Sequence, residues 1–211
     1  MLVLALLAAG SRRQLGYWRD GTELFTHALA VTHGNWLAHN NLGEALAREG
    51  RVEEATVHFA EAVRLRPDYA NGEFNLGRSL EVAGRPAEAI AHYGRTLQID
   101  PSWVGAHVNL GLILLARGET EPAVDHLREA VRLKPDSAKA HFNLGRALGE
   151  QGATDEAIAH YLQALRLDPD FAEAHLSLAA TLAAQGRTLE AGPHFARAMQ
   201  LRPEWAARTT P

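Results

Sequence analysis

The sequence predicts an all-α fold, a solenoid of antiparallel helix pairs. Three observations predict it: a fixed repeat length, a helical spacing of apolar residues inside each repeat, and glycine and proline at fixed places between the helices. Leucine shows the repeat length, since it recurs every 34 residues at Leu42, Leu76, Leu110, Leu144 and Leu178. A period of roughly 20 to 50 residues is typical of solenoids, in which each repeat buries its core against its neighbours. The frame contains five full repeats, which are 36–69, 70–103, 104–137, 138–171 and 172–205.

Apolar residues inside each repeat have the spacing of helices. In the first repeat, two runs of apolar or small residues are spaced mainly by three and four, which is a helical period and not the alternation of a strand. The runs are Leu37, Leu42, Ala45 and Leu46, then Ala55, Phe59, Ala62, Val63 and Leu65. Gly50 between them can take positive φ and close the first helix, and Pro67 stops the second. Both residues recur in every repeat, so each repeat is predicted as helix, short turn, helix, short turn.

Residues 1–35 are predicted as a degenerate N-terminal repeat, or as the end of a membrane helix followed by half a repeat. The first ten residues, MLVLALLAAG, are apolar and uncharged, but a bilayer span takes about 20 residues. They form the first helix of a degenerate repeat, the tail of a longer membrane helix or a cleaved signal peptide. The signal peptide is disfavoured because no positive charge precedes the apolar run. Residues 16–35 fit the second half of a repeat, with Trp18, Phe25 and Ala28 at its packing places.

The two helices of each repeat are expected to pack closely at a glycine. Frame position 8, counted from Trp36, holds Gly43, Gly77, Gly111, Gly145 and Ala179. Glycine inside a helix costs about 1 kcal/mol relative to alanine, so its recurrence predicts close approach of the second helix. A small residue at position 20, which is Ala55 in the first repeat, should face the glycine. Position 24 should fill the adjacent gap with Phe59, Tyr93, Leu127, Tyr161 and Phe195.

The last repeat is predicted to be the weak end of the array. Its second helix contains Gly192 and Pro193. With Thr188 as the helix cap, Pro193 falls near the fifth helical residue, where proline removes a backbone donor at a cost of about 3 kcal/mol. We expect the helix to kink or to begin later, and the region around Phe195 to stay partly uncovered. Hydrogen exchange should be fastest in 188–211, since the tail 206–211 is too short for a covering helix, and this end should pair with a second chain.

Composition narrows the function classes. The chain has 211 residues, with 46% hydrophobic and 22% charged, a balance typical of a soluble array. The net charge of −4 offers no basic field to nucleic acid. The absence of cysteine excludes disulfides, thiolate metal sites and a cysteine nucleophile. No glycine-rich phosphate loop, G-x-S-x-G or H-E-x-x-H motif occurs. We therefore predict no enzyme activity and no cofactor.

The repeated motifs resemble the tetratricopeptide repeat. Leucine and glycine at positions 7 and 8, alanine at 20, an aromatic residue at 24, alanine at 27 and proline at 32 carry the resemblance over residues 36–205. It implies a right-handed superhelix in which the first helix of each repeat lines a concave, protein-binding face. Two departures are Thr96 at position 27 and the residues at position 4, where the family often has tryptophan. The stretch before Trp36 also resembles the junction in bacterial multi-span membrane proteins that carry a C-terminal arm of these repeats.

Nine of the eleven histidines follow the repeat. Position 23 holds His58, His92, His126, His160 and His194, and position 4 holds His39, Glu73, His107, His141 and His175. Metal ligands must converge to about 2.0–2.1 Å from one ion, whereas equivalent helices of neighbouring repeats lie roughly 9 Å or more apart. Equivalent positions therefore do not share an ion. We predict packed rings with one nitrogen bonded or solvated, and no metal site.

The predicted binding surface lies on the first helices. Position 6 carries an asparagine ladder, which resembles the ladder of O-linked N-acetylglucosamine transferases and can bond the backbone of an extended peptide. Its members are Asn41, Asn75, Asn109 and Asn143. An apolar floor lies beside it, made of Phe74, Val108, Leu112, Leu115 and Phe142, and two arginines, Arg78 and Arg146, flank the floor. The expected partner is a protein or peptide with apolar anchors and acidic character. No repeat carries the paired basic residues at positions 2 and 6 with which some relatives clamp a C-terminal carboxylate.

Three functional hypotheses follow from these features. The first is a protein–protein interaction scaffold that holds an extended peptide or partner surface in its groove. The second is the substrate-selecting arm of a glycosyltransferase or membrane enzyme whose catalytic part lies elsewhere. The third is self-assembly through uncovered ends. A soluble array, cytoplasmic or tethered to a bacterial membrane by its N-terminus, is expected in each case.

Overall fold

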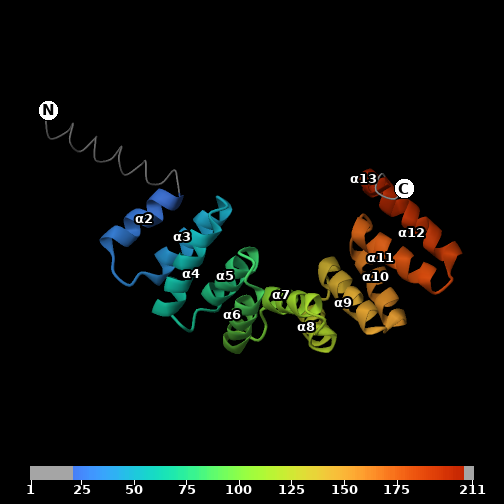
Figure 1. Cartoon of the computed structure of the whole chain (residues 1–211), viewed down its shortest axis with the longest axis horizontal. Coiled ribbons are helices and arrows are strands. Elements are labelled where there is room, and N and C mark those ends of the chain that lie inside the picture. The colour runs from blue at the N-terminus through green and yellow to red at the C-terminus, as the bar shows by residue number, and fades with distance from the viewer. Residues whose placement is uncertain (1–20, 207–211) are drawn as a thin grey trace. The chain divides into compact units, whose positions relative to one another are not determined.

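The computed structural model describes residues 21–206 and forms only helices and turns over that range (Figure 1). The chain divides at Pro101–Ser102 into two compact units. Unit 1 contains α2 (Gly21–Val31), α3 (Trp36–Arg48), α4 (Val52–Leu65), α5 (Ala70–Val82) and α6 (Pro86–Ile99). Unit 2 contains α7 (Val104–Ala116), α8 (Thr120–Leu133), α9 (Ala138–Gln151), α10 (Thr154–Leu167), α11 (Ala172–Ala184), α12 (Thr188–Leu201) and α13 (Pro203–Ala206). Each unit is described by itself.

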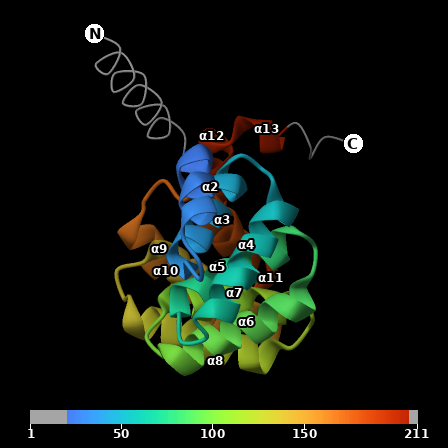
Figure 2. The same ribbon diagram turned by 90° about the vertical axis from the view of Figure 1, so that its left-hand side faces the viewer.

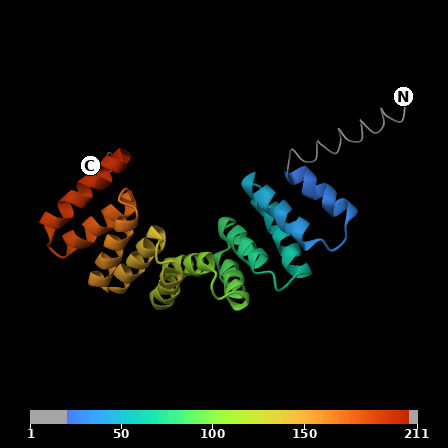
Figure 3. The ribbon, with the colours of Figure 1, turned by 180° about the vertical axis from the view of Figure 1, so that it is seen from behind.

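Each predicted repeat forms a hairpin of two antiparallel helices (Figures 1 and 3). The hairpins are α3–α4 and α5–α6 in unit 1, and α7–α8, α9–α10 and α11–α12 in unit 2. The glycine between the two helices has a φ of 74° to 87° in all five hairpins, as expected for a residue that ends a helix in the left-handed region. The all-α class and the helix pairing predicted from the sequence are confirmed.

The close approach predicted at frame position 8 is present in four hairpins. A Cβ atom built on Gly43, Gly77, Gly111 or Gly145 would lie only 2.7–2.8 Å from the side chain at position 24 of the same hairpin. Real Cβ contacts are not that short, so glycine is required for the ring of Phe59, Tyr93 or Tyr161, or for Leu127, to lie against the first helix. The main partner is thus the residue at position 24, while position 20 adds a backbone oxygen 3.2 Å away in the hairpins of Gly111 and Gly145.

The predicted core residues are buried. The leucines that mark the period, from Leu42 to Leu178, are all buried, and so are the alanines at position 20. Thr96 replaces alanine at position 27 and is fully buried, where its Oγ1 donates to the backbone oxygen of His92 at 2.9 Å. This bond agrees with the expectation that a polar atom at that place finds a neighbour.

The N-terminal half repeat is partly described. Helix α2 packs against α3 (Figure 2), in the place expected for the second helix of a preceding repeat. Phe25 and Ala28 are half-buried, whereas Trp18, the apolar residues 1–10 and the proposed first helix lie outside the described residues. No helix between residues 21 and 206 is long and apolar enough to cross a membrane.

The last hairpin differs from the expectation in its helix boundaries. Helix α12 runs from Thr188 to Leu201 and includes Pro193, so the expected later start of the helix does not occur. Thr188 is the first residue of the helix, and Arg187 is the cap residue. Gly is replaced by Ala179 at position 8 of this hairpin, and Phe195 at position 24 is 46% exposed. The region around Phe195 is thus partly uncovered, as expected.

Candidate peptide-binding surface

The asparagine ladder lies on the first helices, but its members differ in exposure. Asn41, Asn109 and Asn143 are half-buried, whereas Asn75 is only 7% exposed. The expectation that the amides are accessible is therefore wrong for Asn75. Its Nδ2 donates to Asn40 Oδ1 and to Glu44 Oε1, each at 3.0 Å, so its hydrogen-bonding capacity is partly used inside unit 1.

Asn40, Asn75 and the half-buried Glu44 form a polar cluster in unit 1 that the sequence did not predict. Asn40 is 1% exposed and its Nδ2 also donates to Glu44 Oε1 at 3.0 Å. Two amides thus converge on one carboxylate oxygen. The signal that points to it is at frame position 5, where Asn40 is the polar exception among residues that are otherwise Phe, Val and Leu.

The predicted apolar floor is divided between the two units. Phe74 and Phe142 are half-buried and lie against the tyrosine of their own hairpins, with ring centroids 5.7 Å from Tyr93 and 6.0 Å from Tyr161. Val108 and Leu112 are half-buried in α7, whereas Leu115 is 5% exposed and belongs to the core of unit 2. Leu115 is therefore not a surface residue, contrary to the expectation.

The two predicted arginines lie over these phenylalanines. The guanidinium carbon of Arg78 is 5.9 Å from the ring centroid of Phe74, and that of Arg146 is 6.0 Å from the ring centroid of Phe142. Such distances suit a cation–π contact. The same pair of residues is thus presented in the same way on the first helix of a hairpin in each unit.

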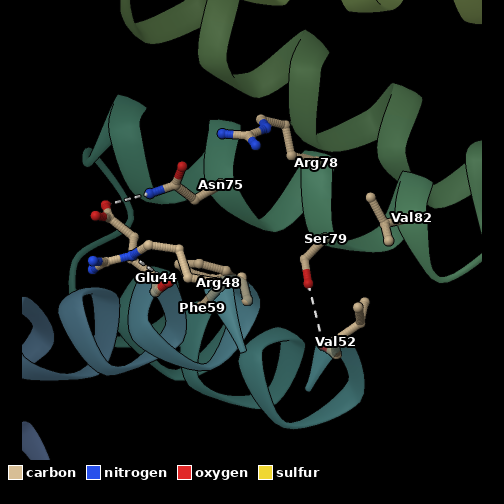
Figure 4. Close-up of a pocket in the computed structure, with 9 residues that line it drawn as sticks. Glu44, Arg48, Val52, Phe59, Asn75, Arg78, Ser79 and Val82 are labelled. Carbon is tan, nitrogen blue, oxygen red and sulfur yellow. Dashed lines mark hydrogen bonds between the residues drawn. The ribbon is translucent and has the colours of Figure 1, made fainter. Parts of the chain in front are cut away.

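Unit 1 carries a pocket of about 420 Å³ between α3, α4 and α5. Figure 4 shows Glu44 and Arg48 on one side of it and Asn75, Arg78 and Val82 on the other. The remaining lining residues are Ala47, Val52, Phe59 and Ser79. The pocket therefore combines an apolar wall with charged groups of both signs.

Unit 2 carries a pocket of similar volume, about 420 Å³, between α9, α10 and α11. It is lined by Arg146, Gly149, Glu150, Thr154, Tyr161, Ala180, Thr181 and Ala184. These residues occupy the same frame positions as the lining of the first pocket: 9, 12, 13, 17 and 24 of one repeat and 9, 10 and 13 of the next. Burial raises the pKa of the Tyr161 hydroxyl above its usual value.

Three arginines of this surface lack the acidic partner that most other arginines of the described residues have. At the turns and on the second helices, most arginines pair with a nearby carboxylate, as Arg51 does with Glu54 at 2.7 Å and Arg132 with Glu129 at 2.6 Å. Arg48, Arg78 and Arg146 are exposed, and in the part of the chain that the structure describes none of them has a carboxylate within ion-pair distance. Arg48, Arg78 and Arg146 line the two pockets, whereas Arg166 of α10, which is also exposed and has no carboxylate within that distance, lines neither.

The two histidine ladders meet within each hairpin. The Nδ1 atoms of positions 4 and 23 lie 2.9–3.1 Å apart in His39–His58, His107–His126, His141–His160 and His175–His194. In α5–α6 the pair is Glu73 and His92, at 2.6 Å. Each ring is packed and bonded, as expected. Between residues 21 and 206, no three or more His, Cys, Asp or Glu side chains gather in a way that could hold a metal ion.

Comparison with protein-family models matches the tetratricopeptide repeat in both units. One model, described as a tetratricopeptide repeat, matches residues 35–102, and a second, described as a TPR repeat, matches 111–152 and 145–186. Two curated relatives of Drosophila melanogaster match shorter stretches. Protein O-mannosyl-transferase Tmtc2 is 37% identical over 73 residues, which are 35% of this chain and 8% of that protein. Protein O-mannosyl-transferase Tmtc3 is 41% identical over 51 residues, which are 24% of this chain and 6% of that protein. The chain thus spans less than a tenth of either relative.

Solved structures of repeat proteins share the fold. YrrB, described as a TPR protein with an unusual peptide-binding site, is 22% identical with a TM-score of 0.75, over 90% of this chain and all of that one. MamA from residue 41 to its end, from Desulfovibrio magneticus RS-1, is 23% identical with a TM-score of 0.75, over 81% of this chain and 96% of that one. At these identities the likeness shows the fold alone.

Proposed function

The chain belongs to the tetratricopeptide repeat family, whose repeats form protein-interaction scaffolds, and we propose that the first helices of its hairpins hold an extended segment of a partner protein. The observation that carries the proposal is that Arg48, Arg78 and Arg146, which have no carboxylate within ion-pair distance, line pockets with apolar walls. The same face carries three partly exposed amides, those of Asn41, Asn109 and Asn143. An amide side chain offers both a donor and an acceptor to a peptide backbone. The surface therefore suits a segment with apolar anchors and acidic side chains. The peptide-binding site named for YrrB is in keeping with this use of the fold.

The test is selection of binding peptides from a random displayed library on the wild-type chain. We expect enriched sequences that combine leucine- or phenylalanine-type residues with aspartate or glutamate. The double variant Arg78→Glu and Arg146→Glu should lose those sequences, because it replaces a cation by a carboxylate at each pocket while changing only exposed side chains. The matched control is Arg166→Glu, which reverses an exposed arginine of α10 that lines neither pocket.

Enrichment of the same acidic sequences by the double variant would contradict the electrostatic part of the proposal. A library that yields no enriched peptide on the wild-type chain would contradict peptide binding itself. Loss of binding in the Arg166→Glu control as well would mean that net charge, and not the surface of the first helices, decides.

The likeness to the Tmtc proteins favours a second candidate, in which the array selects substrates for a glycosyltransferase whose catalytic part lies outside these repeats. Such an arm would itself bind proteins without modifying them. The test is binding of unglycosylated acceptor proteins to the isolated chain in the absence of a sugar donor. Equal binding of glycosylated and unglycosylated forms, or binding of neither, would count against a selecting role.

A third candidate is self-association through the end of unit 2. Leu189 of α12 is 93% exposed and Phe195 is half exposed, so this end presents apolar side chains to water. Sedimentation over a range of concentrations should show a dimer that Leu189→Gln with Phe195→Gln abolishes. A wild-type chain that stays monomeric at high concentration would contradict this candidate. The proposed membrane tether falls on residues outside those described.

A further inference from the structure

We infer that the pocket of unit 1 is a socket for a carboxylate side chain of the bound partner, and that Arg48 and Arg78 hold it. The socket presupposes the proposed function, since it is one site on the surface proposed above. Both guanidinium groups are exposed and line the same pocket. A carboxylate accepts two parallel N–H bonds from a guanidinium, which makes arginine the residue best suited to such an anion. These arginines stand at frame positions 13 and 9, not at positions 2 and 6.

Arg48 is oriented toward this role by the backbone. Its Nε donates to the backbone oxygen of Glu44 at 3.2 Å, which occupies one donor and fixes the plane of the group. The terminal nitrogens then remain for a ligand. Arg78 is placed by its contact with Phe74, described above, from the opposite side of the pocket (Figure 4).

Glu44 lines the same pocket and would be the obvious internal partner of these arginines. Its Oε1 instead accepts hydrogen bonds from Asn40 and Asn75, each at 3.0 Å. Both amides are buried, and a buried donor without an acceptor is costly, so the two amides retain the carboxylate. The arginines are therefore left for an acid that arrives with the partner.

Asn40 acts as a positioning residue in this arrangement. Leucine at that place would remove one of the two donors that hold Glu44, and leucine, valine and phenylalanine are the residues found at the same frame position in the other repeats. The released carboxylate would pair with Arg48 or Arg78 and compete with the ligand. Asn40→Leu should therefore weaken acid binding although the residue itself does not line the pocket.

The equivalent pocket of unit 2 provides the internal contrast. Its position 13 holds Glu150 in place of Arg48, and position 9 of the following repeat holds Ala180 in place of Arg78. Its lining contains one cation, Arg146, and one carboxylate, Glu150, so this pocket has no excess of positive charge. Preference for an acidic side chain is thus specific to unit 1.

The experiment uses two fluorescent peptides of equal length, one alternating leucine with glutamate and one alternating leucine with glutamine, titrated against the full chain by fluorescence anisotropy. We expect the glutamate peptide to bind at least tenfold more tightly, with a difference that shrinks as salt is added. Arg48→Gln and Arg78→Gln should each weaken it about tenfold. The Arg166→Gln control should leave it unchanged.

The positioning role has its own readout. Asn40→Leu should weaken binding of the glutamate peptide, and Asn40→Leu combined with Glu44→Gln should restore it, because the internal competitor has then lost its charge. A merely structural role for Asn40 would give no rescue by the second change. Arg48→Gln and Arg78→Gln alter exposed residues, so they still decide the matter if Asn40→Leu does not fold.

Equal affinity of the wild-type chain for the two peptides would overturn the socket. If library-selected peptides bind while both defined peptides fail, the socket is wrong and the proposed function stands. Failure of the library-selected peptides as well would remove the proposed function. Unchanged binding in both arginine variants would show that the acid preference, if measured, arises elsewhere on the chain.

Discussion

In the α5–α6 hairpin the polar pair between the two helices is a carboxylate and an imidazole, whereas the other four full hairpins have two imidazoles at the same place. Glu73 is 3% exposed at the side chain, and its two oxygens lie 2.6 Å from His92 Nδ1 and 3.8 Å from an Arg95 nitrogen. In the other hairpins the Nδ1 atoms of two histidines face each other at 2.9–3.1 Å. The same place in the fold thus holds an acid and a base in one hairpin and two bases in the other four.

Two imidazoles so placed share a single proton. His141 Nε2 lies 3.1 Å from the backbone oxygen of Pro135, and since a carbonyl only accepts, that nitrogen is the donor. Neutral His141 then has its lone pair on Nδ1, and His160 donates its Nδ1–H to it. His175 has the same bond, to Pro169. A second proton would leave two N–H groups and two positive charges facing each other.

The comparison teaches that acid should act on the hairpins unequally. A doubly protonated histidine pair removes its own hydrogen bond and repels. The pairs therefore couple the stability of α3–α4, α7–α8, α9–α10 and α11–α12 to pH, whereas α5–α6 has no such histidine pair.

The largest expected effect concerns the apolar core, which both kinds of hairpin share. Leu76→Ala in α5 and Leu144→Ala in α9 should each destabilise the fold by about 2–5 kcal/mol, because both side chains are buried and each substitution leaves a cavity. Urea unfolding at neutral pH measures the loss. Similar losses would show that the hairpins differ only in their polar pairs, while a loss below about 0.5 kcal/mol in either would contradict the shared core.

A smaller effect concerns the α11–α12 hairpin, which has a histidine pair but also has Pro193 directly before His194. Pro193→Ala restores a backbone donor inside α12 and should raise stability by about 1–3 kcal/mol. Hydrogen exchange over 188–201 should slow accordingly. The idea fails if 188–201 in a monomeric wild-type chain is already as protected as 121–133 of α8.

The smallest effect is the pH dependence, and its sign follows from the direction of the pKa shifts. Burial lowers the pKa of His58, His126, His160 and His194, and the facing histidine lowers each further. Such groups bind fewer protons folded than unfolded, so the stability present above the unfolded pKa of about 6.5 is lost as pH falls below it. Nearby Glu54, Asp125 and Glu156 oppose the shift, in α4, α8 and α10 respectively, and Arg128 adds to it at His160.

The urea concentration at the unfolding midpoint of the wild-type chain should therefore decrease as the pH is lowered from about 7.5 to about 5.5. Changing the four histidines of position 23 to glutamine should flatten that dependence, and Glu73→His, which creates a fifth histidine pair, should steepen it. His33→Gln, in the loop before α3, is the matched control and should change nothing. Midpoints of the wild-type chain that do not depend on pH would contradict proton sharing.

Much of the fold could be predicted from the sequence because the period is a property of the chain itself. The glycine and proline places fixed the helix ends, as the positive φ at Gly50 and its equivalents shows. Glycine at position 8 pointed to a close helix approach, and the structure supplies the contact, the ring or leucine at position 24. Thr188 was misplaced by one residue because threonine is by type the better cap, whereas the helix begins at Thr188 and Arg187 caps it without a side-chain hydrogen bond.

The candidate site was predictable only in outline. The frame placed Arg78, Arg146 and the phenylalanines on the first helices, and they lie there. It did not show that Asn75 is bonded to Asn40 and Glu44, since those bonds run between the first helices of successive hairpins. Arg48 was missed because its importance comes from the pocket it shares with Arg78, and not from its own residue type or spacing.

The sequence by itself determined the repeat length, the helix pairing, the core leucines and the glycine turns, because each is a pattern of residue types that recurs along the chain. Only the tertiary structure decided which polar side chains meet. The histidines of positions 4 and 23, and the amides around Glu44, come from different helices, and a hydrogen bond forms or fails within a few tenths of an ångström. Spacing along a chain fixes the face on which a side chain lies, but the packing of the neighbouring helix decides its partner.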